Sequence, residues 1–153
     1  MIKMDIKSHE ERSRNMASIR SENTKPEVFL RKLLFAHGFR YRLHKKGIPG
    51  KPDIYLAKYN TAIFVNGCFW HRHKECKIAY TPKSNVEFWE KKFQANIERD
   101  QRQQVQRDEL GLRTLIVWEC TIRKMMKDKK KCSEVLEKII QFLNDKTCNY
   151  AEL

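Results

Sequence analysis

The chain has 153 residues, of which 32 are Lys or Arg and 19 are Asp or Glu, so its formal net charge is +13. This length fits one compact domain, residues 1–153, with a single sizeable core. The sequence contains no apolar run long enough for a membrane span, and its N-terminus is charged rather than signal-like. We therefore expect a cytoplasmic protein with no membrane partner.

The positive charge predicts a polyanionic partner, and nucleic acid is the one we expect. Basic side chains are concentrated in residues 1–60 and again in residues 123–131, RKMMKDKKK. Residues 1–20 are polar and include RSRNMASIR, so we interpret them as a DNA-contacting arm that contains a short helix outside the core. A generic basic surface and an anionic membrane surface are the alternatives.

The first predicted core element is a helix over residues 24–38. Thr24 is a candidate N-cap, Pro26 suits the first turn, and Glu27 completes a capping box. Gly38 ends the helix. The apolar stripe of this helix is Val28, Leu30, Leu33 and Leu34.

The remaining elements alternate in the manner of an α/β fold. Extended segments are predicted at residues 39–45, 53–59 and 61–67, with a turn at Tyr59-Asn60. A long helix is predicted over residues 84–111, with Ser84 and Glu87 as its capping box. A buried strand follows over residues 113–120. The C-terminal part, residues 133–153, is predicted to be a helix over residues 133–143 and a tail. This order predicts a mixed sheet flanked by helices.

A dense group of metal-ligand side chains follows the third extended segment. Cys68, His73 and Cys76 are spaced C-x4-H-x2-C, and Cys120 follows the buried strand. Zn²⁺ accepts such a Cys3His set, and four protein ligands indicate a structural site. The odd total of five cysteines argues against a complete disulfide framework. Unrelated thiols and surface histidines are the alternative, and His71 could also be the fourth ligand.

Two further residues fit phosphodiester chemistry. If zinc takes His73, then His71 is free to act as a general base, because histidine titrates near neutral pH. Asp53 begins a strand after Pro52, where its carboxylate could hold Mg²⁺. Each pattern is unspecific by itself, since Asp53 could be a turn residue and His71 a structural side chain.

Five segments occur together in one order: RSRNMASIR, PGKPDIYL, IFVNGCFWHRHKEC, EFWEKKFQANIERD and LIVWEC. This ensemble, over residues 12–120, resembles the very short patch repair (Vsr) endonucleases. These bacterial enzymes nick DNA beside T:G mismatches that arise when 5-methylcytosine deaminates. The resemblance implies a restriction-endonuclease-like core with a zinc-braced loop. It also implies a nick 5′ of the mismatched thymine, and a likeness of this kind predicts a monomer acting on double-stranded DNA.

The resemblance also implies roles for individual residues. Asp53 and the backbone carbonyl of Val65 would hold the catalytic Mg²⁺, and His71 would deprotonate the attacking water. Glu27 would be an accessory catalytic residue near the metal, although its capping role alone explains it. The structural Zn²⁺ would be bound by Cys68, His73, Cys76 and Cys120. Val65 and Asn66 depart from the threonine and histidine that many relatives carry.

Aromatic side chains beside the ligand loop suggest a DNA wedge. Opening a base step costs least where pairing is already weak, as at a mismatch. The resemblance implies that Phe69, Trp70 and Trp89 enter the stack from one groove and Met16 from the other. Core packing is the alternative interpretation, above all for Trp89.

Two other functional classes fit part of this pattern. A zinc-braced DNA-binding protein without activity explains the charge and the ligands, but leaves Asp53 and His71 without a role. A restriction-type nuclease would cut intact duplex. For the mismatch nuclease, mismatch-repair proteins and a functionally linked cytosine-5 methyltransferase are the expected partners in the cell.

Overall fold

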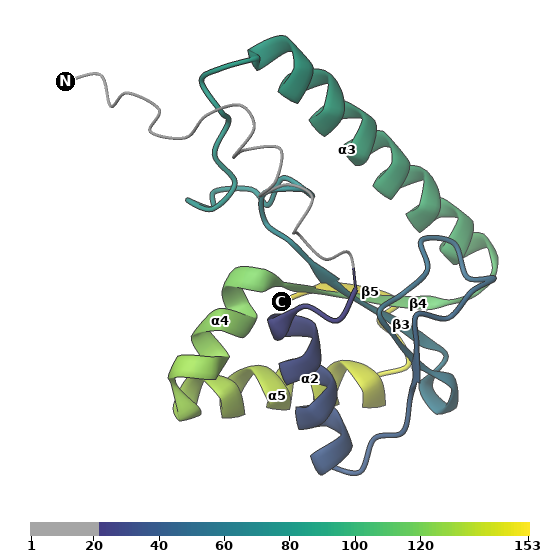
Figure 1. The fold of residues 1–153 in the computed structure, drawn as a ribbon. Helices are drawn as coiled ribbons and strands as arrows, with labels where there is room; N and C mark the ends of the chain where they lie inside the picture. Colours follow the sequence, from purple (N-terminus) through teal and green to yellow (C-terminus); the bar gives the residue numbers. More distant parts are fainter. Residues whose placement is uncertain (1–21) are drawn as a thin grey trace.

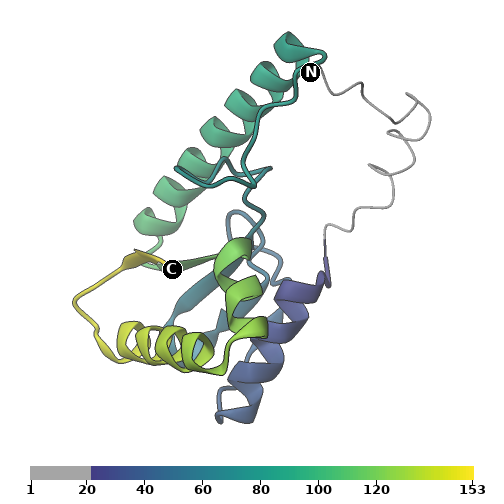
Figure 2. The same cartoon turned by 90° about the vertical axis from the view of Figure 1, so that its left-hand side faces the viewer.

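The computed structural model describes residues 22–153. Met16 and the arm expected over residues 1–20 lie outside the described residues. The described part is a mixed sheet between two layers of helices (Figures 1 and 2). Among the helices of residues 22–153, none combines the length and the apolar character needed to cross a membrane.

The sheet has the strand order β1-β2-β3-β4-β5. Its first three strands form an antiparallel meander, whereas β3, β4 and β5 run parallel. The predicted mixed sheet is therefore confirmed. The strand bounds are β1 Arg42–Leu43, β2 Ile54–Leu56, β3 Thr61–Asn66, β4 Arg113–Trp118 and β5 Tyr150–Glu152.

Each connection between two parallel strands contains helices that lie on one face of the sheet. The β3-to-β4 connection contains α3, on one face, and the β4-to-β5 connection contains α4 and α5, on the other face together with α2 (Figures 1 and 2). The helix bounds are α2 Lys25–Ala36, α3 Val86–Glu109, α4 Glu119–Lys127 and α5 Lys129–Asn144. The sheet is flanked by helices as predicted.

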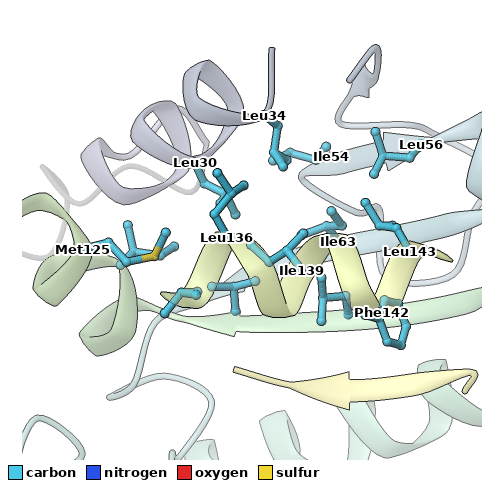
Figure 3. Close-up of a cluster of buried hydrophobic side chains, with 14 residues drawn as sticks. Leu30, Leu34, Ile54, Leu56, Ile63, Met125, Leu136, Ile139, Phe142 and Leu143 are labelled. Carbon is cyan, nitrogen blue, oxygen red and sulfur yellow. The ribbon is translucent and has the colours of Figure 1, made fainter. Parts of the chain in front are cut away.

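The main core lies between the sheet and the layer of α2, α4 and α5. Leu30 and Leu34 of α2 meet Ile54 of β2 and Ile139 of α5 there (Figure 3). All four side chains are fully buried, and burying an aliphatic side chain of this size contributes about 1.5–3 kcal/mol. This core supports the end of the sheet from which the loop after β3 and the start of α4 emerge.

The predicted start of α2 is confirmed. Thr24 Oγ1 accepts from the backbone N–H of Glu27 at 3.4 Å. The Glu27 carboxylate accepts from the N–H of Asn23 at 3.0 Å, one residue earlier than a capping box requires. The carboxylate of Glu27 is thereby turned into the protein, where 1% of the residue is exposed.

Several predicted boundaries were wrong. The first extended segment, predicted over residues 39–45, contains only the two-residue strand β1, Arg42–Leu43. Helix α3 begins at Val86 after Asn85, which has a left-handed backbone (φ 52°) and makes no side-chain cap. Ser84 is therefore not the N-cap of the expected capping box; a short polar residue such as asparagine tolerates the left-handed conformation at the helix start. Strand β2 ends at Leu56, and a 3-10 turn over Ala57–Tyr59, rather than a two-residue turn, leads into β3.

The C-terminal third also differs from the prediction. Cys120 lies in the first turn of α4, a helix that was not expected, rather than at the end of a strand. Helix α5 begins at Lys129 instead of residue 133, because Asp128 caps it by accepting from the N–H groups of Lys130 and Lys131. The tail predicted after the last helix contains β5, which pairs with β4.

Candidate active site and metal centre

One end of the sheet carries the predicted site residues. Because β2 runs antiparallel to β3, the residue before β2 lies beside the last residues of β3. Asp53 Oδ2 accepts from the N–H of Val65 there at 2.7 Å. Parallel pairing of Asn66 with Trp118 brings the loop after β3 next to the start of α4. Asp53, the ligand loop and Cys120 therefore meet at this edge.

The four predicted zinc ligands form one cluster. The ligand atoms of Cys68, His73, Cys76 and Cys120 all lie within 4.8 Å of one another. The N–H of Cys120 donates to Cys68 Sγ at 3.4 Å, and His73 Nδ1 lies 3.5 Å from Cys120 Sγ. The His73 ring stacks on Trp118 with centroids 4.2 Å apart. These contacts fix the orientation of the ligands before any ion binds.

The electrostatics of the cluster suit a soft divalent cation. Burial raises the pKa of the Cys68 thiol, so a thiolate at this position needs a compensating positive charge. For Cys76, burial is the largest single effect and raises the pKa of the thiol, but hydrogen bonds with the backbone of Ile78 and Ala79 and with the thiols of Cys68 and Cys120 together lower it. Burial lowers the pKa of His73 and favours the neutral ring that binds metal. The donor set therefore fits Zn²⁺.

A second cluster brings Glu27 and Asp53 together with His44, which the sequence analysis missed. The ligand atoms of these three residues also lie within 4.8 Å of one another. Glu27 Oε1 is 2.6 Å from His44 Nε2, and the N–H of His44 donates to the carbonyl of Asp53 at 3.2 Å. His44 directly follows β1, which pairs with β2, and that register places it beside Asp53.

The carboxylate of Asp53 is strongly perturbed. Its pKa is raised to about 6, chiefly by burial and also by the neighbouring Glu27 carboxylate. The hydrogen bond from Val65 and the electrostatic influence of the His44 and His71 rings lower the pKa of Asp53. A divalent cation would relieve the repulsion between the two carboxylates, so the donor set fits a hard or borderline metal. Val65 contacts Asp53 through its N–H; its carbonyl remains a predicted ligand.

His71 lies outside the Cys/His cluster and pairs with an acidic residue of α3. Its Nδ1–H donates to Asp100 Oδ2 at 2.6 Å, and its backbone N–H donates to the carbonyl of Gly67 at 3.1 Å. This arrangement leaves Nε2 free to accept a proton. Asp100 was not predicted, because nothing in the local sequence pairs it with a histidine 29 positions away.

The three aromatic residues predicted to form the wedge pack together. The Phe69 ring lies edge-on to Trp70, Trp89 and Phe93, with centroid distances of 5.1, 5.5 and 5.2 Å. We call Phe69, Trp70 and Trp89 the aromatic cluster. All three are partly exposed, whereas Phe93 is buried and joins the cluster to α3.

Arg72 holds the loop that carries Phe69 and Trp70, whereas Trp89 lies in the first turn of α3. Its guanidinium donates to the carbonyl oxygens of Phe69, Ala79 and Tyr80 at 3.2, 3.0 and 3.0 Å. It also lies over the Phe93 ring, 3.8 Å from the centroid. Arg72 thus ties both ends of the loop to α3, a role that its position among the ligands did not reveal.

A cavity of about 1030 Å³ lies beside these groups, between α3 and the sheet. His71 and Asp100 line it, together with the basic residues Lys51 and Arg99. The candidate general base is therefore accessible from a surface that includes positive charge, as a phosphate substrate requires.

Comparison with known proteins gives consistent matches. The family model described as DNA mismatch endonuclease Vsr matches residues 4–77. The type II nicking enzyme V.NmeAIP of Neisseria meningitidis is 43% identical over 141 residues, which are 92% of this chain and 97% of that protein. V.XorIIP of Xanthomonas oryzae pv. oryzae is 43% identical over 77% of this chain and 86% of its own. The DNA mismatch endonuclease Vsr of Escherichia coli is 40% identical over 78% of this chain and 76% of its own.

Proposed function

Since this chain belongs to the Vsr family of DNA mismatch endonucleases, we propose that it nicks duplex DNA 5′ of the thymine in a T:G mismatch. Family membership makes it an endonuclease that acts on DNA and implies the restriction-endonuclease-like core expected from the sequence. The nick would initiate very short patch repair of sites where 5-methylcytosine has deaminated.

One observation carries the proposal. The Asp53 carboxylate and the His71–Asp100 pair lie at the same end of the sheet, because Asp53 Oδ2 accepts from the N–H of Val65 at the end of β3 and His71 belongs to the loop that follows β3. A binding module has no need of a buried carboxylate beside an oriented histidine. A hydrolytic enzyme needs both, one to hold a cation and one to accept a proton.

The proposed chemistry assigns one step to each group. Asp53, with the Val65 carbonyl and Glu27 as an accessory residue, would hold Mg²⁺, which when bound would stabilise charge on the phosphate and on the leaving 3′-oxygen. His71 Nε2 would accept a proton from the attacking water, while Asp100 holds the ring and stabilises its protonated form. The product would carry a 5′-phosphate.

The Cys/His cluster would serve a structural role. Cys68, His73, Cys76 and Cys120 would bind Zn²⁺ and brace the loop that carries Phe69 and Trp70. Phe69, Trp70 and Trp89 would then enter the base stack at the weakened T:G pair, with Met16 approaching from the opposite groove. We propose action as a monomer at the nucleoid, with mismatch-repair proteins and a cytosine-5 methyltransferase as functional partners.

The test is nicking of a labelled duplex that holds one T:G pair, compared with otherwise identical T:A and C:G duplexes. Reactions with and without Mg²⁺ should give a nick only for T:G, only with Mg²⁺ and only on the thymine strand. Asp53→Ala and His71→Ala should each abolish nicking and retain mismatch binding. Equal cutting of the three duplexes would refute mismatch specificity, and tight binding without any nick would favour the binding module.

A further inference from the structure

We propose that His44 supplies a nitrogen ligand to the cation site of Glu27 and Asp53, so that this site binds Mn²⁺ in preference to Mg²⁺. The proposal rests on the proposed function for the view that this site is catalytic. It goes further in naming His44 as a ligand and in assigning a metal preference.

The geometry places the imidazole among the carboxylates. His44 Nε2 is 2.6 Å from Glu27 Oε1, and the donor atoms of Glu27, His44 and Asp53 lie within 4.8 Å of one another. His44 Nε2 and Glu27 Oε1 face each other, so both atoms could contact one cation after His44 Nε2 loses its proton. The backbone hydrogen bond from His44 to Asp53 holds the two residues in register, so little rearrangement is needed.

The other ring nitrogen has the surroundings of a metal ligand. His44 Nδ1 faces Glu22 Oε2 at 3.8 Å, and Glu22 is itself paired with Lys51. Histidine ligands commonly offer their second nitrogen to a carboxylate, which fixes the ring and strengthens the donor. Among residues 22–153, Arg31 is a further cationic neighbour of Glu27, and its Nη1 lies 3.7 Å from Oε1.

A nitrogen ligand changes which cation is preferred. Mg²⁺ favours oxygen ligands and retains its water, whereas Mn²⁺, a transition-metal ion that shares the preference for carboxylates, accepts an imidazole nitrogen more readily than Mg²⁺ does. The Cys3His cluster shares no ligand with this site, so zinc can occupy that cluster while a second metal is titrated. We expect Mn²⁺ to bind at least about tenfold more tightly than Mg²⁺.

The experiment measures metal binding without DNA, using protein that carries zinc. Mn²⁺ is titrated by electron paramagnetic resonance and displaced with Mg²⁺, and pulsed spectra of the Mn²⁺ form report nitrogen coupling. His44→Gln should lower the ratio of Mn²⁺ to Mg²⁺ affinity about tenfold or more and remove the nitrogen coupling. His71→Gln should keep both, and so should His37→Gln, which changes an exposed histidine at the end of α2.

Measurements on the wild type and on His44→Gln would overturn the proposal in any of three ways: an unchanged ratio in His44→Gln, nitrogen coupling that survives in that variant, or wild-type Mn²⁺ spectra without nitrogen coupling. The last is read from the wild type and does not depend on how the variant folds. Failure of the proposed function can be distinguished from failure of this metal-binding proposal, because it would appear as the absence of T:G nicking with Mg²⁺. Retention of the Mn²⁺ signal in Asp53→Ala would also overturn it, by placing the ion elsewhere.

Discussion

His71 Nδ1 and Asp100 Oδ2 lie 2.6 Å apart and join the loop after β3 to the middle of α3. This bond fixes both the orientation of the imidazole and the nitrogen that carries its proton. It also makes the position of α3 relevant to catalysis, since Asp100 reaches His71 only while α3 lies over the sheet. Arg107, buried on the same helix, secures that position by donating to Thr114 of β4 at 3.0 Å.

Replacing Asp100 by Asn should slow nicking about 100-fold and leave T:G binding unchanged, because the ring loses the acceptor that selects its tautomer. Single-turnover nicking and mismatch affinity check this prediction, and a shifted pH–rate profile would distinguish a change at His71 from general misfolding. Glu98→Gln, a change of an exposed carboxylate on the same helix, is the control and should nick normally. Full activity of Asp100→Asn would remove Asp100 from the mechanism.

The buried carboxylate of Asp53 should make stability depend on pH. Burial raises its pKa from 3.8 to about 6, so the folded protein holds this proton more tightly than the unfolded chain. The stabilisation is complete below about pH 4 and is lost as the pH rises through about 6. Asp53→Asn stays neutral and should therefore be more stable than the wild type at about pH 8, by on the order of 2–3 kcal/mol.

Urea unfolding of zinc-loaded protein in magnesium-free buffer measures this difference. The gain in free energy of unfolding from Asp53→Asn should shrink as the pH falls from about 8 towards 5.5. Added Mn²⁺ or Mg²⁺ should stabilise only the wild type. Asp108→Asn, at an exposed carboxylate of α3, should show neither effect. A gain that is the same at every pH would mean that Asp53 has an ordinary pKa.

Local sequence signals predicted the parts of the fold that local chemistry determines. Thr24 and the apolar spacing of Leu30 and Leu34 were enough to place α2, because capping and periodicity act within a few residues. The spacing of Cys68, His73 and Cys76 likewise indicated one cluster, since a short loop brings close ligands together. Cys120 joined it because parallel pairing of β3 and β4 aligns the ends of these strands.

The parts that were missed depend on contacts between distant segments. Asp100 and His44 become site residues only through helix packing and strand register, which no short motif encodes. Strand β5 is three residues long and is created by its pairing with β4. Helix α4 was hidden because its first residues, Glu119 and Cys120, directly continue the apolar run of β4.

Purified protein should contain one zinc ion per chain, and Cys120→Ser should lose it. The expected result follows from the cluster, in which removal of one of four ligands leaves three donors and an unbraced loop. Metal analysis and thermal unfolding measure the two effects. Cys132→Ala, which changes a cysteine at the main core, should retain zinc. A well-folded wild-type preparation without zinc would contradict the assignment.

Arg72→Met should weaken T:G binding about tenfold, or about 1.4 kcal/mol, with less effect on the rate of nicking at saturating DNA. The variant removes the hydrogen bonds to Phe69, Ala79 and Tyr80. Its loop must then become ordered when DNA binds, and this ordering costs binding free energy. A fluorescent base analogue beside the mismatch should report less unstacking at equal DNA. Lys77→Met removes a charge at an exposed position of the same loop and should lower affinity less.

The comparison with Lys77→Met separates loop order from simple attraction to phosphate. Loss of a phosphate contact weakens binding to T:G and T:A duplexes alike and reduces the salt dependence of affinity. Loss of loop order should instead weaken T:G binding selectively, because in the proposed function the aromatic cluster enters the base stack only at the weakened T:G pair. Equal losses on both duplexes would show that Arg72 contributes only its charge.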